Sequence, residues 1–170
     1  MESFKVRVSK DYLSFCAAHF ILYNGTQCER LHGHNYRVSA EIEGTLDDDY
    51  LVFDFISLKG ILREICAELD HRTLIPLRSK VFSIETSDTS VRMQYEDREW
   101  VFPRDDCCLL PIENSTAELL ARWISGKLVE ELTPRMSTST AILEKVTIEV
   151  EESPGQCALY EASSPILTPR

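Results

Sequence analysis

The segment Cys28-Glu29-Arg30-Leu31-His32-Gly33-His34 places a thiol and two of the chain's four histidines within seven residues. Apolar residues follow at every second position from Tyr36 to Ile42, which is typical of a strand with one buried face. His32 and His34 share that parity, so both imidazoles point to one side, where two ring nitrogens can reach one metal ion. The segment therefore predicts a strand from Leu31 to Glu43 that begins with a pair of candidate metal ligands.

A third imidazole is available in His19, which ends the apolar run that starts at Phe15. Three histidines leave the fourth position of a tetrahedral ion open, as in catalytic zinc sites. Gly33 leaves the opposite face of its strand bare, so another backbone or a ligand can approach closely. Two alternatives stay open: His19 is an ordinary buried or surface group, or Cys28 closes the shell as the fourth ligand of a structural zinc site.

Size and charge narrow the class of protein. A chain of 170 residues with 44% apolar content fits one domain with an ordinary core. The formal charge of -10 argues against nucleic acid or an anionic membrane as a partner, since either needs a basic surface. An anionic substrate must then be held by a metal ion or by a few clustered Arg and Lys side chains.

The N-terminal segment and the cysteines point to one compartment. Met1 to Arg7 lacks the apolar core of a signal peptide, and no run approaches the length of a membrane span. The six cysteines are scattered without the spacing of a disulfide scaffold. We expect a cytoplasmic protein with reduced thiols.

Periodicity along the chain predicts an α+β protein. Strands are expected at residues 4–19, 31–43, 51–55 and 143–151, and helices at 57–71 and 116–132, with Ser57 capping the first and the stretch from Asn114 to Glu118 opening the second. Most of the strand alternation is one-sided, which favours an antiparallel sheet with both helices on its other face. The adjacent Cys107 and Cys108 are expected in a loop, and the tail from Ser163 to Arg170 is expected to be loose.

Residues 81–103 predict additional strands around the polar turn 96–99, which indicates a surface β-hairpin. The sequence gives no role for this hairpin.

Two further spots carry candidate chemistry. Asp70 precedes His71, and a carboxylate that orients an imidazole is a common acid–base device, although such a pair is also frequent at helix ends. Thr116 and Glu118 have the spacing of a helix cap. Glu152 lies at a strand end, where a glutamate is usually just solvated.

Six spots taken together carry a resemblance: Phe15-x-Ala17-Ala18-His19, Cys28-x-x-x-His32-Gly33-His34, Phe53-Asp54-Phe55, Leu69-Asp70-His71, Thr116-x-Glu118 and Glu152-Ser153. In this order they resemble the 6-pyruvoyltetrahydropterin synthase and 6-carboxytetrahydropterin synthase family. The resemblance covers nearly the whole chain except Arg78 to Leu110. It implies one domain over residues 1–170 with an insertion at about 78–110, and a T-fold (tunnelling fold): an antiparallel sheet with two helices on one face, assembled into hexamers with active sites between subunits.

The resemblance also implies a role for each matched residue. His19, His32 and His34 bind zinc (Zn2+); Cys28 is the catalytic base; Asp70 and His71 form a partner acid–base pair; Glu152, Thr116 and Glu118 hold the pterin ring.

The implied reaction is zinc-dependent. Its substrate is 7,8-dihydroneopterin triphosphate, which loses triphosphate and acetaldehyde to give 6-carboxy-5,6,7,8-tetrahydropterin. The form of the segment from Cys28 to His34 resembles the bacterial carboxy-forming enzymes of queuosine (deazapurine) synthesis. The alternatives are a 6-pyruvoyltetrahydropterin synthase, which releases triphosphate only, and a non-catalytic zinc-stabilised pterin-binding protein. Leu74-Ile75 and the insertion depart from the family pattern, which leaves the preference for the substrate side chain open.

Overall fold

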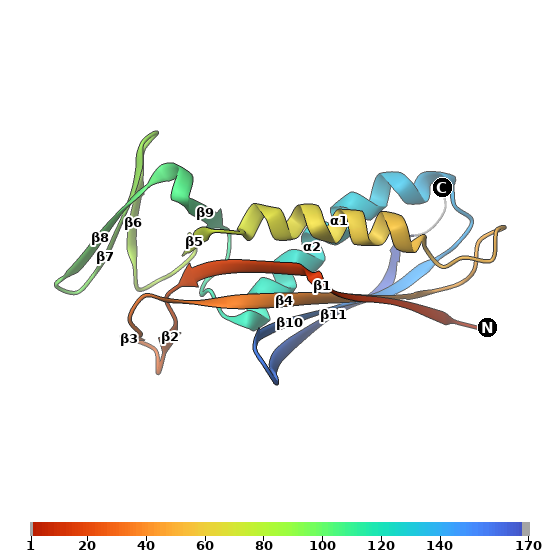
Figure 1. Cartoon of the computed structure of the whole chain (residues 1–170), viewed down its shortest axis with the longest axis horizontal. Coiled ribbons are helices and arrows are strands. Elements are labelled where there is room, and N and C mark those ends of the chain that lie inside the picture. Colours follow the sequence, from red (N-terminus) through yellow and green to blue (C-terminus); the bar gives the residue numbers. More distant parts are fainter. Residues whose placement is uncertain (1, 168–170) are drawn as a thin grey trace.

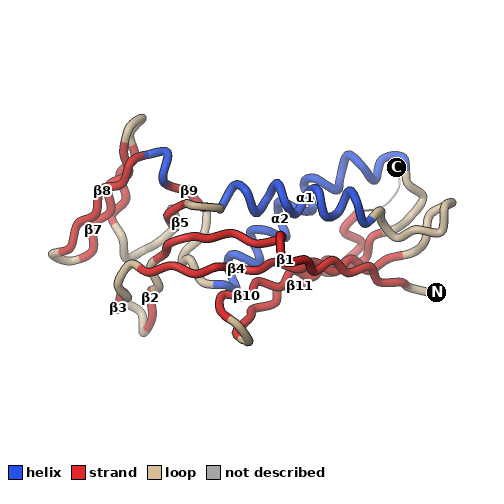
Figure 2. The backbone as a smooth tube through the Cα atoms, in the orientation of Figure 1, coloured by secondary structure: helices blue, strands red, loops and turns tan. Residues whose placement is uncertain are grey.

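Two helices cover one face of a six-stranded sheet, and a separate three-stranded sheet lies at one end of the molecule (Figures 1 and 2). The computed structural model describes residues 2–167. The six-stranded sheet consists of β1 (Phe4–His19), β4 (His32–Gly44), β5 (Arg72–Pro76), β9 (Cys107–Leu110), β10 (Leu143–Ser153) and β11 (Gln156–Leu167). The helices are α1 (Phe55–Leu69) and α2 (Ala117–Arg135). The predicted α+β T-fold with two helices on one face is confirmed.

The sheet is mixed, whereas the sequence predicted an antiparallel one. The strand order is β11-β10-β4-β1-β5-β9; the first four are antiparallel, and β5 and β9 are added in parallel. Strands β5 and β9 are short and contain continuous apolar runs, so they give no alternating signal. The expected loop at Cys107-Cys108 is therefore wrong, because both residues lie in β9.

The C-terminal segment is also more ordered than the sequence indicated. Strand β11 pairs with β10 through the turn at Pro154-Gly155, where Gly155 has a φ of 80°. The part of the expected loose tail from Ser163 to Leu167 belongs to this strand, and residues 168–170 lie outside the described residues. The two prolines of the tail concealed the strand, because proline is normally depleted from strands.

The start of α1 differs from the prediction by one turn. The strand expected at 51–55 is wrong: residues 51–54 are bend and loop, and Phe55 begins the helix. The helix is capped by Asp54, whose carboxylate accepts the backbone N–H of Ser57 at 2.7 Å. Ser57, which was expected to be the capping residue, instead donates its backbone N–H to the cap. The C-terminal end is as expected, with Asp70 at the C-cap. In α2 the predicted cap is confirmed, because the Thr116 hydroxyl accepts from Leu119 N at 3.4 Å.

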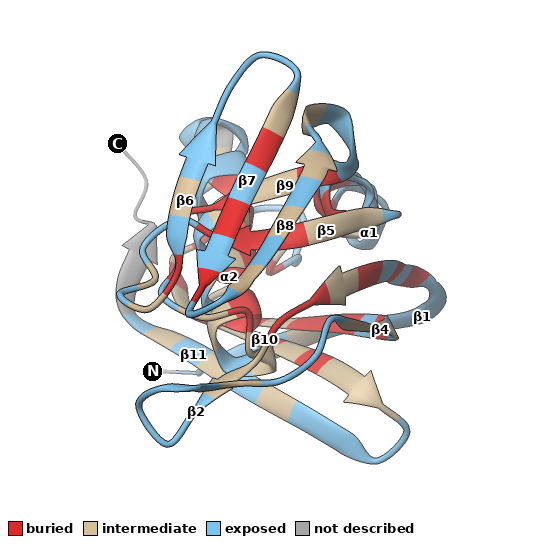
Figure 3. Ribbon diagram, turned by 90° about the vertical axis from the view of Figure 1, so that its left-hand side faces the viewer, coloured by how far each residue is buried: buried red, intermediate tan, exposed pale blue. Residues whose placement is uncertain are grey.

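The insertion forms a three-stranded sheet, one strand more than a hairpin. It consists of β6 (Ser83–Thr86), β7 (Ser90–Tyr95) and β8 (Arg98–Pro103), and we call it the inserted sheet. Every second residue of β7 is buried, as Figure 3 shows. These residues form a cluster of their own with Phe20 and Phe82, which we call the insertion cluster.

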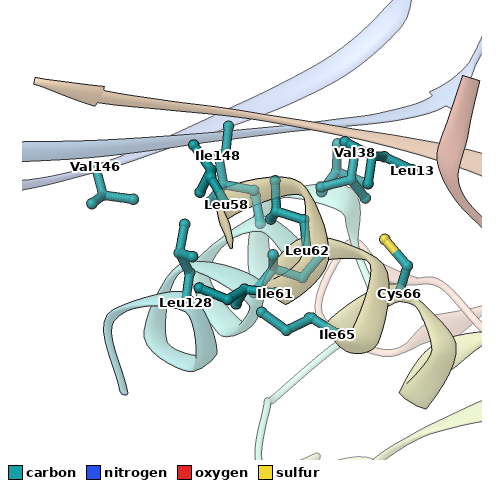
Figure 4. Packing of buried hydrophobic residues seen from close by; sticks show 14 of the residues in the cluster. Leu13, Val38, Leu58, Ile61, Leu62, Ile65, Cys66, Leu128, Val146 and Ile148 are labelled. Carbon is teal, nitrogen blue, oxygen red and sulfur yellow. The ribbon is translucent and has the colours of Figure 1, made fainter. Parts of the chain in front are cut away.

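The main core lies between the sheet and the helices. Leu58, Leu62 and Leu69 of α1 are fully buried against the sheet face that carries Tyr36 and Ile148. Figure 4 shows the apolar side of α1 directed toward the sheet. The helix thus fixes one face of β4, the strand on which His32 and His34 lie.

Shortening one of these side chains should destabilise the fold. We expect Leu62→Ala to lower the free energy of unfolding by about 2–5 kcal/mol, because it removes buried methyl groups and leaves a cavity. Glu64→Ala, on the exposed side of the same helix, should change it by less than about 0.5 kcal/mol. Urea denaturation followed by circular dichroism measures both values, and equal values for the two variants would contradict this account of the core.

Candidate metal centre

Three histidines from two adjacent strands converge at one end of the sheet. His19 is the last residue of β1 and lies directly opposite His32, the first residue of β4. His34 follows two residues later on the same face. One nitrogen from each ring lies within 4.8 Å of the others. The structure therefore brings together the three residues expected to hold a metal.

Gly33 allows the two strands to come this close. A Cβ atom at this position would meet the carbonyl oxygen of Ala17 at 2.9 Å, closer than a real side chain tolerates. The bare face predicted for Gly33 is occupied by the backbone of β1, which also carries His19.

Backbone contacts fix the tautomers of two of the rings. The Nδ1 atom of His19 lies 2.8 Å from the carbonyl oxygen of Ser115, and that of His32 lies 2.8 Å from the carbonyl oxygen of Arg30. A carbonyl oxygen can only accept, so each Nδ1 carries the proton and each Nε2 presents a lone pair. This second contact on each ring is the arrangement that orients metal-binding histidines.

The distance between the two lone pairs fits a metal ion. The Nε2 atoms of His19 and His32 lie 3.1 Å apart, a distance at which two unprotonated nitrogens repel each other. A tetrahedral ion with metal–nitrogen bonds of about 2.0–2.1 Å requires nitrogens separated by roughly 3.4 Å. A cation between the rings thus replaces the repulsion by two bonds, and the donor set fits zinc.

Burial keeps His19 in the form that binds metal. Its side chain is fully buried, and this burial lowers the pKa of His19, so the ring is neutral near pH 7. Tyr36 lies beside it, with its hydroxyl 3.0 Å from His19 Nδ1. Burial raises the pKa of Tyr36, which therefore stays protonated and donates to Glu152 Oε1 at 3.4 Å.

An open cavity of about 510 Å³ is lined by His32 and His34, and His19 lies buried behind them. Carboxylates line it on both sides of the rings: Glu152 Oε1 lies 3.6 Å from His19 Nε2 and 3.9 Å from His34 Nε2, and Glu29 Oε2 lies 3.7 Å from His32 Nε2. Thr116 and Glu118, from the start of α2, also line the cavity. The residues expected to hold the pterin therefore share a wall with the histidines.

Cys28 lies at the edge of this arrangement. Its side chain packs against the insertion cluster and is absent from the lining of the cavity. The thiol donates to the carbonyl oxygen of Glu29 at 3.2 Å, and burial raises its pKa, an effect opposed by the neighbouring Arg98. Among the described residues, the group that can hold a metal contains the three histidines and no cysteine.

Asp70 and His71 form a pair outside the cavity. The Asp70 carboxylate contacts His71 Nδ1 at 2.9 Å and accepts the backbone N–H of Cys16 at 2.7 Å, and this second bond lowers the pKa of Asp70. The His71 side chain is 83% exposed, and its φ is 56°. The pair is therefore attached to β1 through Cys16, and the imidazole is exposed to solvent.

Two residues that matter for the geometry were not predicted. Glu29 lies on the cavity wall, and Ser115 provides the carbonyl that orients His19. The sequence contained one possible signal for Glu29: it lies three residues before His32, where the loop that leads into β4 can bring its side chain near the His32 ring. Nothing local marked Ser115, since its contact joins residues 96 positions apart.

Comparison with known proteins defines the family. Residues 7–163 match the description 6-pyruvoyl tetrahydropterin synthase. The chain belongs to this family. A relative from Methanocaldococcus jannaschii, named putative 6-carboxy-5,6,7,8-tetrahydropterin synthase, is 32% identical over 149 residues, which are 87% of this chain and 89% of the relative. A relative of the same name from Pyrococcus horikoshii is 32% identical over 141 residues, 82% of this chain and 80% of its own.

Solved structures of the family have the same fold. The 6-pyruvoyl tetrahydropterin synthase of Plasmodium falciparum is 36% identical and superimposes with a TM-score of 0.87, over 96% of this chain and 100% of its own. Two variants of the Plasmodium vivax enzyme, 34% identical with the same TM-score and coverage, carry alanine and cysteine in place of a glutamate described as a catalytic residue. None of the described helices of this chain combines the length and apolar character needed to cross a membrane.

Removal of one histidine of the triad should strongly weaken zinc binding. We expect His19→Ala to lower zinc affinity by more than about 100-fold, because loss of a group that merely orients a ligand already costs about 10–100-fold. His71→Ala removes the one remaining histidine of the chain and should leave zinc binding unchanged. Isothermal titration with zinc compares the two variants with the wild type. Weakened binding in His71→Ala and normal binding in His19→Ala would contradict the assignment of the site.

Proposed function

We propose that the protein is a zinc-dependent lyase that converts 7,8-dihydroneopterin triphosphate and one water molecule to 6-carboxy-5,6,7,8-tetrahydropterin, triphosphate and acetaldehyde. The observation that carries the proposal is the open triad: three histidine nitrogens converge on a cavity that also presents acid–base groups. The archaeal relatives named 6-carboxytetrahydropterin synthases support this product, which belongs to queuosine and deazapurine synthesis.

The histidines are proposed to hold the zinc ion, and the side chain of the substrate lies beside them in the cavity. When bound, zinc stabilises the negative charge that develops on the side-chain oxygens during proton removal. The buried ring of His19 and its bond to Ser115 keep the site preorganised, so little reorganisation is needed. The overall charge of -10 makes a local cation necessary for a triphosphate substrate.

The base that removes a carbon-bound proton is proposed to come from the segment Cys28-Glu29. Cys28 is the residue to which the family resemblance assigns this role, and its thiol needs a nearby cation to ionise at neutral pH. Glu29 is a second candidate, because its carboxylate lies on the cavity wall beside His32. The glutamate described as catalytic in the Plasmodium vivax enzyme supports a carboxylate in such a role.

Asp70 and His71 are proposed to return a proton in the cavity of a neighbouring subunit. The pair is held by backbone bonds on β1, and its imidazole is exposed, which suits a group that completes a site only after assembly. The Asp70 carboxylate, 2.9 Å from His71 Nδ1, orients the ring. This arrangement agrees with the hexamer that we propose, with sites between subunits.

Glu152 is proposed to accept the paired N–H donors of the pterin, which a carboxylate suits. Its side chain is 26% exposed and lies between the cavity of the triad and a second cavity of about 480 Å³. Thr116 and Glu118 are proposed to contact the ring from the start of α2. The capping bond of Thr116 to Leu119 fixes that end of the wall.

Two other reactions remain candidates within the same cavity. The Plasmodium structures are named 6-pyruvoyl tetrahydropterin synthases, which supports loss of triphosphate alone. A Pyrococcus furiosus relative, 39% identical over 61 residues, is named dihydroneopterin monophosphate aldolase. A carboxylate base at Glu29 would suit such an aldol cleavage, which leaves a hydroxymethyl group on the pterin and releases a two-carbon aldehyde phosphate. A non-catalytic pterin-binding protein is the remaining alternative.

The products should distinguish these reactions. Zinc-loaded protein incubated with 7,8-dihydroneopterin triphosphate is expected to give 6-carboxy-5,6,7,8-tetrahydropterin and acetaldehyde in equal amounts, both measured by liquid chromatography with mass spectrometry. Protein treated with a chelator should form neither, and added zinc should restore both. A 6-pyruvoyl product or a hydroxymethyl product would replace the proposed reaction by the corresponding alternative. No product at all would favour the binding protein.

Substitution in the segment Cys28-Glu29 should identify the base. If Cys28 is the base, Cys28→Ala should lower kcat by at least about 100-fold and leave the zinc content unchanged, because general base catalysis contributes about 10²–10⁴-fold. Glu29→Gln is the matched variant: a similar loss confined to Glu29→Gln would assign the role to the carboxylate. Loss of zinc in Cys28→Ala, with a lower melting temperature, would instead indicate a thiol that binds the metal.

A further inference from the structure

The inserted sheet contacts the connection between two of the candidate metal ligands. Residues 20–31 link His19 at the end of β1 to His32 at the start of β4 and contain the small hairpin of β2 (Leu22–Tyr23) and β3 (Gln27–Cys28). We call these residues the β1–β4 connection. In Figure 1 the inserted sheet and this hairpin lie at the same end of the molecule, and Figure 3 shows them from that end.

Aromatic packing joins the inserted sheet to the first residue of the connection. Phe20 directly follows His19 and is fully buried. Its ring centroid lies 4.8 Å from that of Trp100 and 5.6 Å from that of Phe82. The residue next to a candidate metal ligand is thereby a central member of the insertion cluster.

Polar contacts join the inserted sheet to the other end of the connection. The Arg98 guanidinium donates to the backbone carbonyl of Cys28 at 3.2 Å, and the Tyr95 hydroxyl donates to the carbonyl oxygen of Thr26. The two donors are the last residue of β7 and the first residue of β8, on either side of the turn that joins these strands. Both acceptors are backbone carbonyls, so the two bonds fix the backbone of the β1–β4 connection at Thr26 and Cys28.

The Arg98 side chain is itself held in place. Its guanidinium carbon lies 4.7 Å from the centroid of the Tyr95 ring and 5.3 Å from that of Trp100. Arginine stacked on aromatic rings loses little further freedom on forming a hydrogen bond. Within residues 2–167 no carboxylate forms an ion pair with Arg98, whereas Arg92 of the same sheet pairs with Glu99. The charge of Arg98 therefore acts on Cys28.

We propose that Arg98 is a positioning residue for the acid–base segment Cys28-Glu29. Its guanidinium donates to the backbone carbonyl of Cys28 and keeps the Cys28 thiol beside a positive charge. Because the backbone is fixed at Cys28, the side chain of the next residue, Glu29, stays on the cavity wall next to His32. The inserted sheet is then a support for the site. This inference rests on the proposed function only in assigning acid–base work to the segment, and it holds for either candidate base.

The charged and titratable groups around the thiol decide the direction of the effect. Arg98 from β8 lowers the pKa of Cys28, whereas Glu29 raises it, and Tyr95 from β7 faces the same sulfur. If Arg98 is removed, only burial and Glu29 act on the pKa of Cys28, and both raise it. The Cys28 thiolate should then form only at higher pH.

The test compares Arg98→Ala, Arg98→Lys and Arg92→Ala in zinc-loaded protein. The first readout is the rate at which iodoacetamide alkylates Cys28 across a pH series, resolved by peptide mass spectrometry, with the exposed Cys16 and Cys157 as internal references. In Arg98→Ala the midpoint of the Cys28 profile should rise, so that alkylation at pH 7.5 is about 3- to 10-fold slower relative to its high-pH limit. Arg92→Ala should match the wild type, and Arg98→Lys, which keeps the charge, should recover most of the shift.

The second readout is turnover. Arg98→Ala should lower kcat by about 10- to 100-fold, the loss typical of a misplaced catalytic group, with KM within about 2-fold, because the residues proposed to bind the pterin are untouched. The melting temperature and zinc content establish that each variant is folded and loaded. Arg98→Lys should recover turnover only in part, since lysine cannot reproduce the stacked planar donor.

Several outcomes would overturn the proposal. An unchanged alkylation profile in Arg98→Ala, a shift of equal size in Arg92→Ala, or a kcat within about 2-fold of the wild type each contradicts it. If the wild type forms none of the expected products, the proposed function fails, and the alkylation profile alone decides whether Arg98 controls Cys28.

Discussion

The pairing of β1 with β4 is the constraint on which the site depends. It places His19 opposite His32, and the two-residue period of β4 adds His34 on the same face. A slip of one residue would turn the β4 rings to the other side of the sheet. The register also depends on a bulge: the chain advances five positions along β1, from Ser9 to Ser14, while it advances only two along β4, from Ser39 to Arg37. Without this bulge, the register of the first half of the pairing would place Glu29 opposite His19 in place of His32.

The parts of this arrangement that the sequence predicted are local. The alternation from Tyr36 to Ile42 identified the buried face of β4, and the parity of His32 and His34 placed their rings on it. The apolar rhythm of α1 and the capping residue of α2 were equally readable, because helices and strands repeat with a fixed period. Predictions made from the spacing of neighbouring residues were therefore largely confirmed.

The features that the sequence did not predict involve long-range pairing. Strands β5 and β9 are defined by their pairing with neighbouring strands. Their short apolar sequences could equally belong to a loop, so the sequence alone does not identify them as strands. The bond from His19 to Ser115 joins distant segments, and no local pattern announces it. Cys16 is bonded to the Asp70 carboxylate and to the backbone N–H of His71, and these contacts between distant segments have no local signal. Each of these facts requires the assembled sheet.

The position of the insertion in the topology has an evolutionary meaning. Strands β5 and β9 are parallel neighbours, and such strands must be joined by a crossover of a dozen or more residues whatever its content. The inserted sheet occupies that crossover. Related proteins could therefore carry a longer, shorter or different segment there without a change in the register between β1 and β4. The fold thereby separates a segment that can diversify from the strands that hold the histidines, and the two meet again at Phe20 and at the connection next to Cys28.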